Sequence, residues 1–123
     1  MKAKILAAAE DFVHALNTPG DLKKVGQACS ESIVIERMGV FSQQGQLVET
    51  FVGVDAVGSW LARTPAGIEF RVVSAEVADS PTWRVRYAYS VPKEGYHHAG
   101  TWLLRLGTDD KITWMQHNPD PSA

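Results

Sequence analysis

Apolar residues recur along the chain with two different spacings, one typical of helices and one typical of strands. Residues 2–17 carry Ile5, Phe12 and Leu16 on one stripe, with apolar positions three or four residues apart. This spacing predicts an amphipathic helix that ends before Pro19. Similar spacing over residues 22–29 and 53–62 predicts two further short helices.

Six other segments alternate apolar with polar or small side chains, which predicts half-buried strands. These segments are residues 32–38, 47–52, 68–77, 83–91, 96–106 and 112–118. We expect the second to pair with the first as a hairpin and the last three to form an antiparallel meander. The order of elements predicts an α+β domain with helices on one face of an antiparallel sheet. A strongly bent sheet would leave a cavity under the helices, and residues 119–123 are expected to fray.

Size and charge restrict the class of protein. The 123 residues suffice for one domain, residues 1–123, with a core of its own. The net charge is −2, whereas nucleic-acid binding usually requires a strongly basic face, so we expect no nucleic-acid partner. No apolar run approaches the roughly 20 residues of a membrane span, so no membrane partner is expected. Glu10 and Asp11 interrupt the first apolar run, which favours a helix over a signal peptide.

The cysteine and histidine content gives no sign of a metal or a cofactor. Cys29 is the only cysteine, which excludes an internal disulfide and favours a cytoplasmic location. No basic residue adjoins it, so we predict a packing residue rather than a reactive thiol. His97 and His98 are neighbours on a strand and point to opposite faces, so they cannot share a metal ion. No zinc-site spacing and no glycine-rich phosphate loop is present.

Several short patterns and the order of elements resemble the nuclear transport factor 2-like (NTF2-like) superfamily. This superfamily includes ketosteroid isomerases and SnoaL-type polyketide cyclases. The patterns lie at residues 20–22, 30–36, 53–57 and in the final meander, and the resemblance covers residues 3–118. It implies a cone in which three N-terminal helices pack on a strongly bent antiparallel sheet. It also implies an apolar pocket, cofactor-free chemistry and a homodimer that packs sheet against sheet.

The groups that act in the isomerases are mostly replaced in this chain. The resemblance places the isomerases' helix-one tyrosine on Phe12, which has no hydroxyl, and their penultimate-strand acid on Thr101. Their base falls on Arg37, or on Glu36 if the strand register slips by one residue. At best one of three groups is retained, so we do not expect ketosteroid isomerisation.

His117 is the best candidate for a catalytic group. The resemblance places Met115 and His117 on the cavity side of the last strand, with Thr101 and His97 on the neighbouring strand. SnoaL-like cyclases use an aspartate from the last strand, and His117 is the analogous group. A histidine pKa of about 6.5 suits proton transfer at neutral pH. We expect a general base assisted by His97 and Tyr87; the alternative is a structural histidine at a strand end.

The pocket is expected to hold a small apolar or amphipathic molecule. Its predicted wall residues are Phe12, Leu16, Trp60, Leu61, Tyr87, Leu103 and Met115. Arg37 is a candidate clamp for a ligand carboxylate or, equally, one half of a surface ion pair. An enzyme of this kind would carry out isomerisation, cyclisation, dehydration or hydrolysis. The alternative is a non-catalytic binding or association module whose own side chains fill the cavity.

The placement of two tryptophans depends on the strand register. In the register of the family, Trp102 and Trp114 alternate with Thr101 and Met115 and lie on the convex face of the sheet. Such an apolar patch predicts a homodimer through that face. In the opposite register both tryptophans are in the core and His117 is in water. The distribution of large apolar side chains between the two faces of the penultimate strand favours that alternative, but we expect the register of the family.

Overall fold

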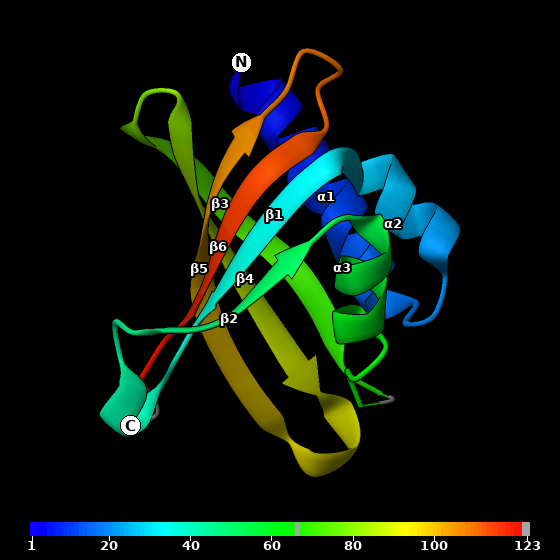
Figure 1. The fold of residues 1–123 in the computed structure, drawn as a ribbon. Coiled ribbons are helices and arrows are strands. Elements are labelled where there is room, and N and C mark those ends of the chain that lie inside the picture. Colours follow the sequence, from blue (N-terminus) through cyan, green and yellow to red (C-terminus); the bar gives the residue numbers. More distant parts are fainter. Residues whose placement is uncertain (66, 122–123) are drawn as a thin grey trace.

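The computed structural model describes residues 1–65 and 67–121 and contains every helix and strand that the sequence predicts (Figure 1). Two helices are followed by two strands, a third helix and four more strands in the described part of the chain. In order, the elements are α1 (Lys2–Asn17), α2 (Leu22–Ala28), β1 (Cys29–Met38), β2 (Leu47–Val52), α3 (Val54–Leu61), β3 (Glu69–Asp79), β4 (Thr82–Val91), β5 (Tyr96–Leu106) and β6 (Ile112–Pro119). Single-turn helices η1 (Phe41–Gln43) and η2 (Pro92–Glu94) lie in two of the connections.

The six strands form one mixed sheet in the order β2-β1-β6-β5-β4-β3. Neighbouring strands are antiparallel except β1 and β6, which run parallel. The expectation of a wholly antiparallel sheet was therefore wrong. Alternation of side chains reveals a strand but not its partner, and β1 pairs with the last strand, which is far away in the sequence.

The three helices cover one face of this sheet, which we call the inner face; the opposite one is the outer face (Figure 1). Helix α1 packs on β3 and α2, and α3 packs on α2, β1 and β2. Only α1 and α2 precede the sheet, since α3 lies between β2 and β3, so the prediction of three N-terminal helices was wrong in that respect. In the part of the chain that the structure describes, no helix is both long enough and apolar enough to cross a bilayer.

The predicted stripe of α1 forms the centre of the core. Ile5, Phe12 and Leu16 are each at most 5% exposed and face the inner side of the sheet. Burial of an apolar side chain of this size contributes about 1.5–3 kcal/mol to the free energy of unfolding. An isolated helix of 16 residues is only marginally stable in water even when it is rich in alanine, as α1 is, so this packing is what holds the helix in place.

Trp102 lies on the inner face, and its predicted position on the convex face was wrong. Its side chain is completely buried, with its ring stacked on Tyr87 at 4.5 Å and edge-on to Phe12 at 5.2 Å between ring centroids. Leu104, on the same face of β5, is also completely buried. The area that these two side chains remove from water outweighs any gain from burying Thr101, so the strand turns that residue outward.

Strand β6 keeps the predicted orientation. Met115 is completely buried, and His117 pairs with Trp102 across the strands and shares its inner face. Trp114 is turned outward, where the Arg105 guanidinium lies 4.6 Å from its ring centroid. The sequence therefore predicted the orientation of β6 correctly and missed that of β5 by one residue.

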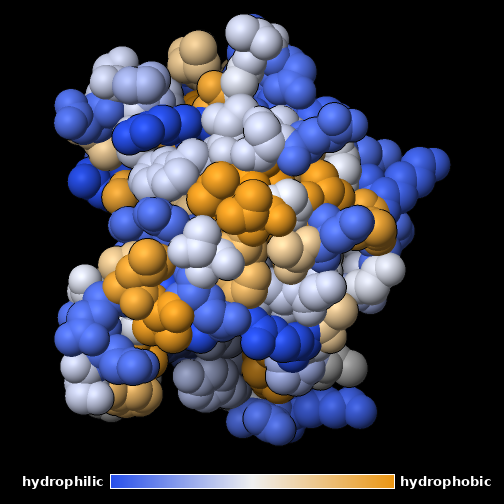
Figure 2. All heavy atoms as spheres, in the orientation of Figure 1, coloured by the Kyte–Doolittle hydropathy of each residue, from blue (hydrophilic) through white to orange (hydrophobic). Residues whose placement is uncertain are grey.

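Ion pairs and apolar patches share the outer face. Figure 2 shows apolar side chains in patches bordered by charged ones on the side where β1 and β6 face the viewer. Arg86 donates to the Thr101 hydroxyl and to both carboxylate oxygens of Asp120, each at 2.8 Å. The tail expected to fray from residue 119 is thus held as far as Asp120, and residues 122–123 lie outside the described part of the chain.

Candidate functional site

A pocket of about 210 Å³ lies between α1, the end of α3 and the inner face of the sheet. Its lining is mostly apolar, as is usual for sites that bind small molecules, although its volume is below the roughly 300–1,000 Å³ that is usual for such sites. The lining residues are Phe12, Leu16, Trp60, Leu61, Thr64, Pro65, Ile68, Phe70, Tyr89, Trp102 and His117.

The predicted wall residues from the helices are where the sequence placed them. Phe12 and Leu16 of α1 and Trp60 and Leu61 of α3 line the pocket, and so does His117. Two others from the prediction lie in the core on the same face rather than on the pocket surface, namely Tyr87 and Met115, which are at most 1% exposed.

Three predicted site residues lie away from the pocket, on the outer face. Leu103 and Thr101 alternate with the buried Trp102 and therefore point to the other side of β5. His97 lies on that same outer side and is exposed. All three followed from the register of β5, so one error in register moved them together.

Trp102 and a group of residues from β3 and β4 line the pocket without having been predicted as wall residues. Phe70 and Tyr89 are cross-strand partners whose rings are 5.0 Å apart. For Trp102 a signal was available, because Leu104 and Leu106 share its face and make that face the more apolar one. Phe70 and Tyr89 lie on segments whose alternation is equally clear, but that alternation does not tell which face the helices cover.

The indole of Trp102 holds His117 in one tautomer. Its Nε1–H donates to Nδ1 of His117 at 3.0 Å. The imidazole also stacks on Tyr87, with 5.4 Å between ring centroids, and meets the ring of Trp60 edge-on at 5.2 Å. A nitrogen that accepts a hydrogen bond carries no proton, so the neutral ring has its hydrogen on Nε2.

His117 is uncharged at neutral pH. Burial, and secondarily the positive charge of Arg37, lower the pKa of His117 from 6.5 to about 4. Nε2 of His117 has no hydrogen-bond partner among the described residues. Every fully buried side-chain nitrogen or oxygen in this part of the chain does have such a partner, so Nε2 must be partly accessible. The ring thus offers the pocket an N–H donor, while its lone pair is already used by Trp102.

Tyr87, which the sequence suggested as an assistant to His117, keeps its proton at neutral pH and so cannot act as a base. Burial raises the pKa of its hydroxyl far above the usual value. The ring passes so close to Gly100 that a Cβ there would collide with it, and that Cβ would also lie 2.7 Å from the carbonyl oxygen of Asn118. The absence of a side chain at Gly100 is therefore what lets Tyr87 pack beneath His117.

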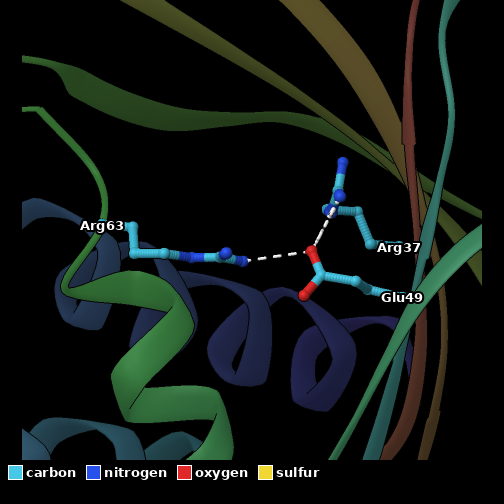
Figure 3. A network of polar contacts seen from close by, with 3 residues as sticks. All are labelled: Arg37, Glu49 and Arg63. Carbon is cyan, nitrogen blue, oxygen red and sulfur yellow. Dashed lines mark hydrogen bonds and ion pairs between the residues drawn. The ribbon is translucent and has the colours of Figure 1, made fainter.

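Two arginines and one glutamate form a network beside the pocket (Figure 3). Nε and Nη2 of Arg37 donate to Oε1 of Glu49 at 3.0 and 2.7 Å, and Nη2 of Arg63 donates to the same oxygen at 3.2 Å. Arg37 pairs with Glu49 across β1–β2 and with His117 across β1–β6. Hydrogen bonds from Arg37 and then from Arg63 lower the pKa of Glu49, so its carboxylate is ionised and the network carries one net positive charge.

The side-chain directions in β1 decide which of its two charged end residues, Arg37 or Glu36, faces the inner side. Arg37 faces the inner side, whereas Glu36 faces the outer side, where Gln116 donates to it at 3.4 Å. A base at the end of β1, as in the isomerases, is therefore missing from the inner face. The ion pair that the sequence offered as the alternative role of Arg37 is present.

The remaining candidates for metal or thiol chemistry are accounted for by packing. Burial raises the pKa of Cys29 to about 12, so it stays a thiol and packs in the core as predicted. His98 faces inward, and its Nε2 lies 3.1 Å from the carbonyl oxygen of Asp120. Among residues 1–65 and 67–121, no three histidine, cysteine or acidic side chains come together as a metal site would require.

No protein-family model and no curated protein matches this sequence. Solved structures do match it. A proposed isomerase of the SnoaL-like family from Agrobacterium tumefaciens has a TM-score of 0.73 and 17% identity, over 96% of this chain and 98% of that one. A proposed ketosteroid isomerase from Kribbella flavida has a TM-score of 0.73 and 15% identity, over 99% and 82% of the two chains. An LEH-like epoxide hydrolase from Mycobacterium tuberculosis has a TM-score of 0.63 and 19% identity, over 97% and 84% of the two chains.

These likenesses define the class of fold. The chain has the α+β fold of the NTF2-like superfamily, to which the sequence was expected to belong. At identities below 20% the likeness is one of architecture, so function must be argued from the site itself.

Proposed function

We propose that this protein binds one small, mainly apolar molecule in the pocket and holds an oxygen atom of that molecule with Nε2–H of His117. The observation that carries the proposal is the Trp102–His117 pair, which presents a neutral donor inside an otherwise apolar lining. A cavity of about 150 Å³ is known to accept benzene. The 210 Å³ here therefore suit a single ring with a short polar arm.

The donor role replaces the general base that the sequence suggested. To accept a proton at Nε2, the ring would need its hydrogen on Nδ1, directly opposite the indole N–H of Trp102. Two donors would then face each other, at the cost of a buried hydrogen bond. A neutral imidazole that donates through its remaining N–H can instead polarise a carbonyl or similar oxygen.

A second candidate function is cofactor-free catalysis of the isomerase, cyclase, dehydratase or hydrolase type. Two of the similar structures are named as isomerases and one as an epoxide hydrolase, which favours such chemistry for this fold. In this chain His117 would polarise the reacting oxygen rather than remove a proton. A strong bend of the sheet into a cone would deepen the pocket, and this bend stays a prediction. The cytoplasmic location also stays a prediction.

Two matched compounds test the binding proposal. We expect 3-phenylpropionamide to bind with a saturable change in tryptophan fluorescence, because Trp60 and Trp102 line the pocket. Propylbenzene has the same ring and chain without the amide, and should bind more weakly. The variant His117→Phe keeps the ring but loses the donor, so the amide should lose about three- to tenfold in affinity while propylbenzene loses none.

A blocked pocket provides the control for this experiment. Ile68 lines the pocket and is only partly buried, so Ile68→Trp should fill the space at little cost in stability. This variant is expected to bind neither compound. Saturable binding that survives Ile68→Trp would place the ligand elsewhere, and no binding to the unaltered protein would leave a self-filled association module as the better interpretation.

We also propose that the outer face forms a homodimer, now with Trp114 rather than Trp102 in the interface. Trp114 is half-buried, has the Arg105 guanidinium 4.6 Å from its ring centroid, and lies on the face that the helices leave uncovered. Replacement of Trp114 by glutamate is expected to convert a dimer to a monomer in light scattering, because it places a charge in an apolar contact. A dimer mass that is unchanged in this variant would refute the interface.

A further inference from the structure

We propose that the pocket selects ligands whose polar end is a carboxylate, and that Arg37 and Arg63 at its edge hold that group. The inference rests on the proposed binding function and names the class of ligand: a small aromatic or aliphatic carboxylic acid. Its apolar body would lie in the pocket and its anionic end would lie between the two guanidinium groups.

The network of Figure 3 is unbalanced in charge and in hydrogen bonds. Two guanidinium groups share one carboxylate, and all three of their hydrogen bonds end on the single oxygen Oε1 of Glu49. Three nitrogens of these groups donate to no described residue, namely Nη1 of Arg37 and Nη1 and Nε of Arg63. Planar guanidinium groups with free N–H donors match a carboxylate in both shape and charge.

The network adjoins the pocket through a continuous set of rings. The guanidinium of Arg63 lies 5.7 Å from the ring centroid of Phe51, and that ring stacks on Trp60 at 4.8 Å. Trp60 lines the pocket and contacts His117 edge-on. Arg37 is the direct neighbour of His117 across β1–β6, on the same face. A ligand that leaves the pocket past Trp60 therefore meets both arginines.

The charges around the pocket favour an anion over a cation. None of the described lining residues is acidic, and Glu49 is the one carboxylate in the network. Glu36, the other nearby acid, faces the outer side. The Nε2–H of His117 is a further donor on the same side, so a carboxylate that binds there meets three donor groups and a single competing carboxylate, that of Glu49.

Stability does not explain the network. The side chains of Arg37 and Arg63 are 32% and 58% exposed, and ion pairs with this much contact with water contribute little to folding. Such exposure leaves both guanidinium groups free to turn toward a ligand. Arg84, which pairs with Glu76 on the outer face, is similarly exposed and provides a comparison far from the pocket.

The test compares 3-phenylpropionate with its neutral amide, which has the same carbon skeleton. We expect the acid to bind about tenfold more tightly than the amide in low salt, with the difference shrinking as salt is added. Arg63→Gln should weaken the acid by about three- to tenfold, and Glu49→Gln should strengthen it by a similar factor because it removes the competing carboxylate. The affinity for the amide should change much less than that for the acid in both variants, and Arg84→Gln should change neither affinity.

Each outcome separates this inference from the proposed function. Equal binding of acid and amide, unchanged in both variants, would overturn the carboxylate proposal and leave the binding function intact. Loss of acid binding in Glu49→Gln as well as in Arg63→Gln would show a purely structural network and would also overturn it. No binding of either compound would overturn the proposed function itself. Melting temperatures close to that of the unaltered protein confirm that each variant is folded.

Discussion

Replacement of Trp102 by alanine is expected to lower the free energy of unfolding by about 3–5 kcal/mol, the range found when a large buried ring is removed. The side chain is completely buried between Phe12 and Tyr87, and its N–H is bonded to His117. The deletion would leave a cavity beside the pocket and an unpaired nitrogen on the histidine. Urea unfolding followed by circular dichroism measures the loss.

Two further substitutions show which part of Trp102 matters. Trp102→Phe keeps most of the buried area but removes the N–H, so we expect a smaller loss of about 1–3 kcal/mol. Trp114→Ala is the matched control, since that ring is only partly buried and lies over Arg105 on the outer face. A loss from Trp102→Ala no larger than that from Trp114→Ala would mean that β5 has the opposite register.

Lowering the pH from 7 to 4 is expected to reduce the free energy of unfolding by about 3 kcal/mol through His117. The pKa of this histidine is about 4 in the folded protein, and it is 6.5 for an unperturbed histidine. Between these values the unfolded chain binds a proton that the folded chain does not, so acid favours unfolding. Each unit of pKa difference is worth about 1.4 kcal/mol. The stabilisation is complete above pH 6.5 and is lost as the pH falls toward 4.

A variant at the same position isolates this contribution. His117→Gln should flatten the stability profile between pH 6.5 and 4, whereas His14→Gln, on the exposed side of α1, should leave the profile as it is. Hydrogen bonds from Arg37 and from Arg86 lower the pKa values of Glu49 and Asp120, so their ion pairs persist to a lower pH than free carboxylates would allow. A profile that is equally steep in His117→Gln would refute the low pKa. Nitrogen chemical shifts of His117 at pH 7 would show directly whether the proton is on Nε2.

Much of the architecture could be predicted because it depends on short-range patterns. The stripe of Ile5, Phe12 and Leu16 identified α1 and its buried face, and the pair Trp60 and Leu61 marked the end of α3 that lines the pocket. A helix or strand buries the residues that recur at its own period, so neighbours in sequence are enough to reveal it.

The site was predicted only in part, because its geometry depends on how strands are paired. The error at Trp102 moved Thr101, Leu103 and His97 out of the expected pocket at once. The parallel pairing of β1 with β6 brings Arg37 beside His117, although the two residues are far apart in the chain. Alternation along one strand carries no record of which residue of another strand lies opposite.

By itself, therefore, the sequence determined which segments are helices and strands, which side of α1 is buried, and that an α+β fold of the NTF2-like kind results. Only the tertiary structure decided which atom of His117 carries the proton and what charge lies beside it. The physical reason is one of range. Secondary structure follows from contacts within a few residues, whereas the tautomer and the pKa of His117 depend on Trp102 and Arg37, which reach it only when the sheet is assembled.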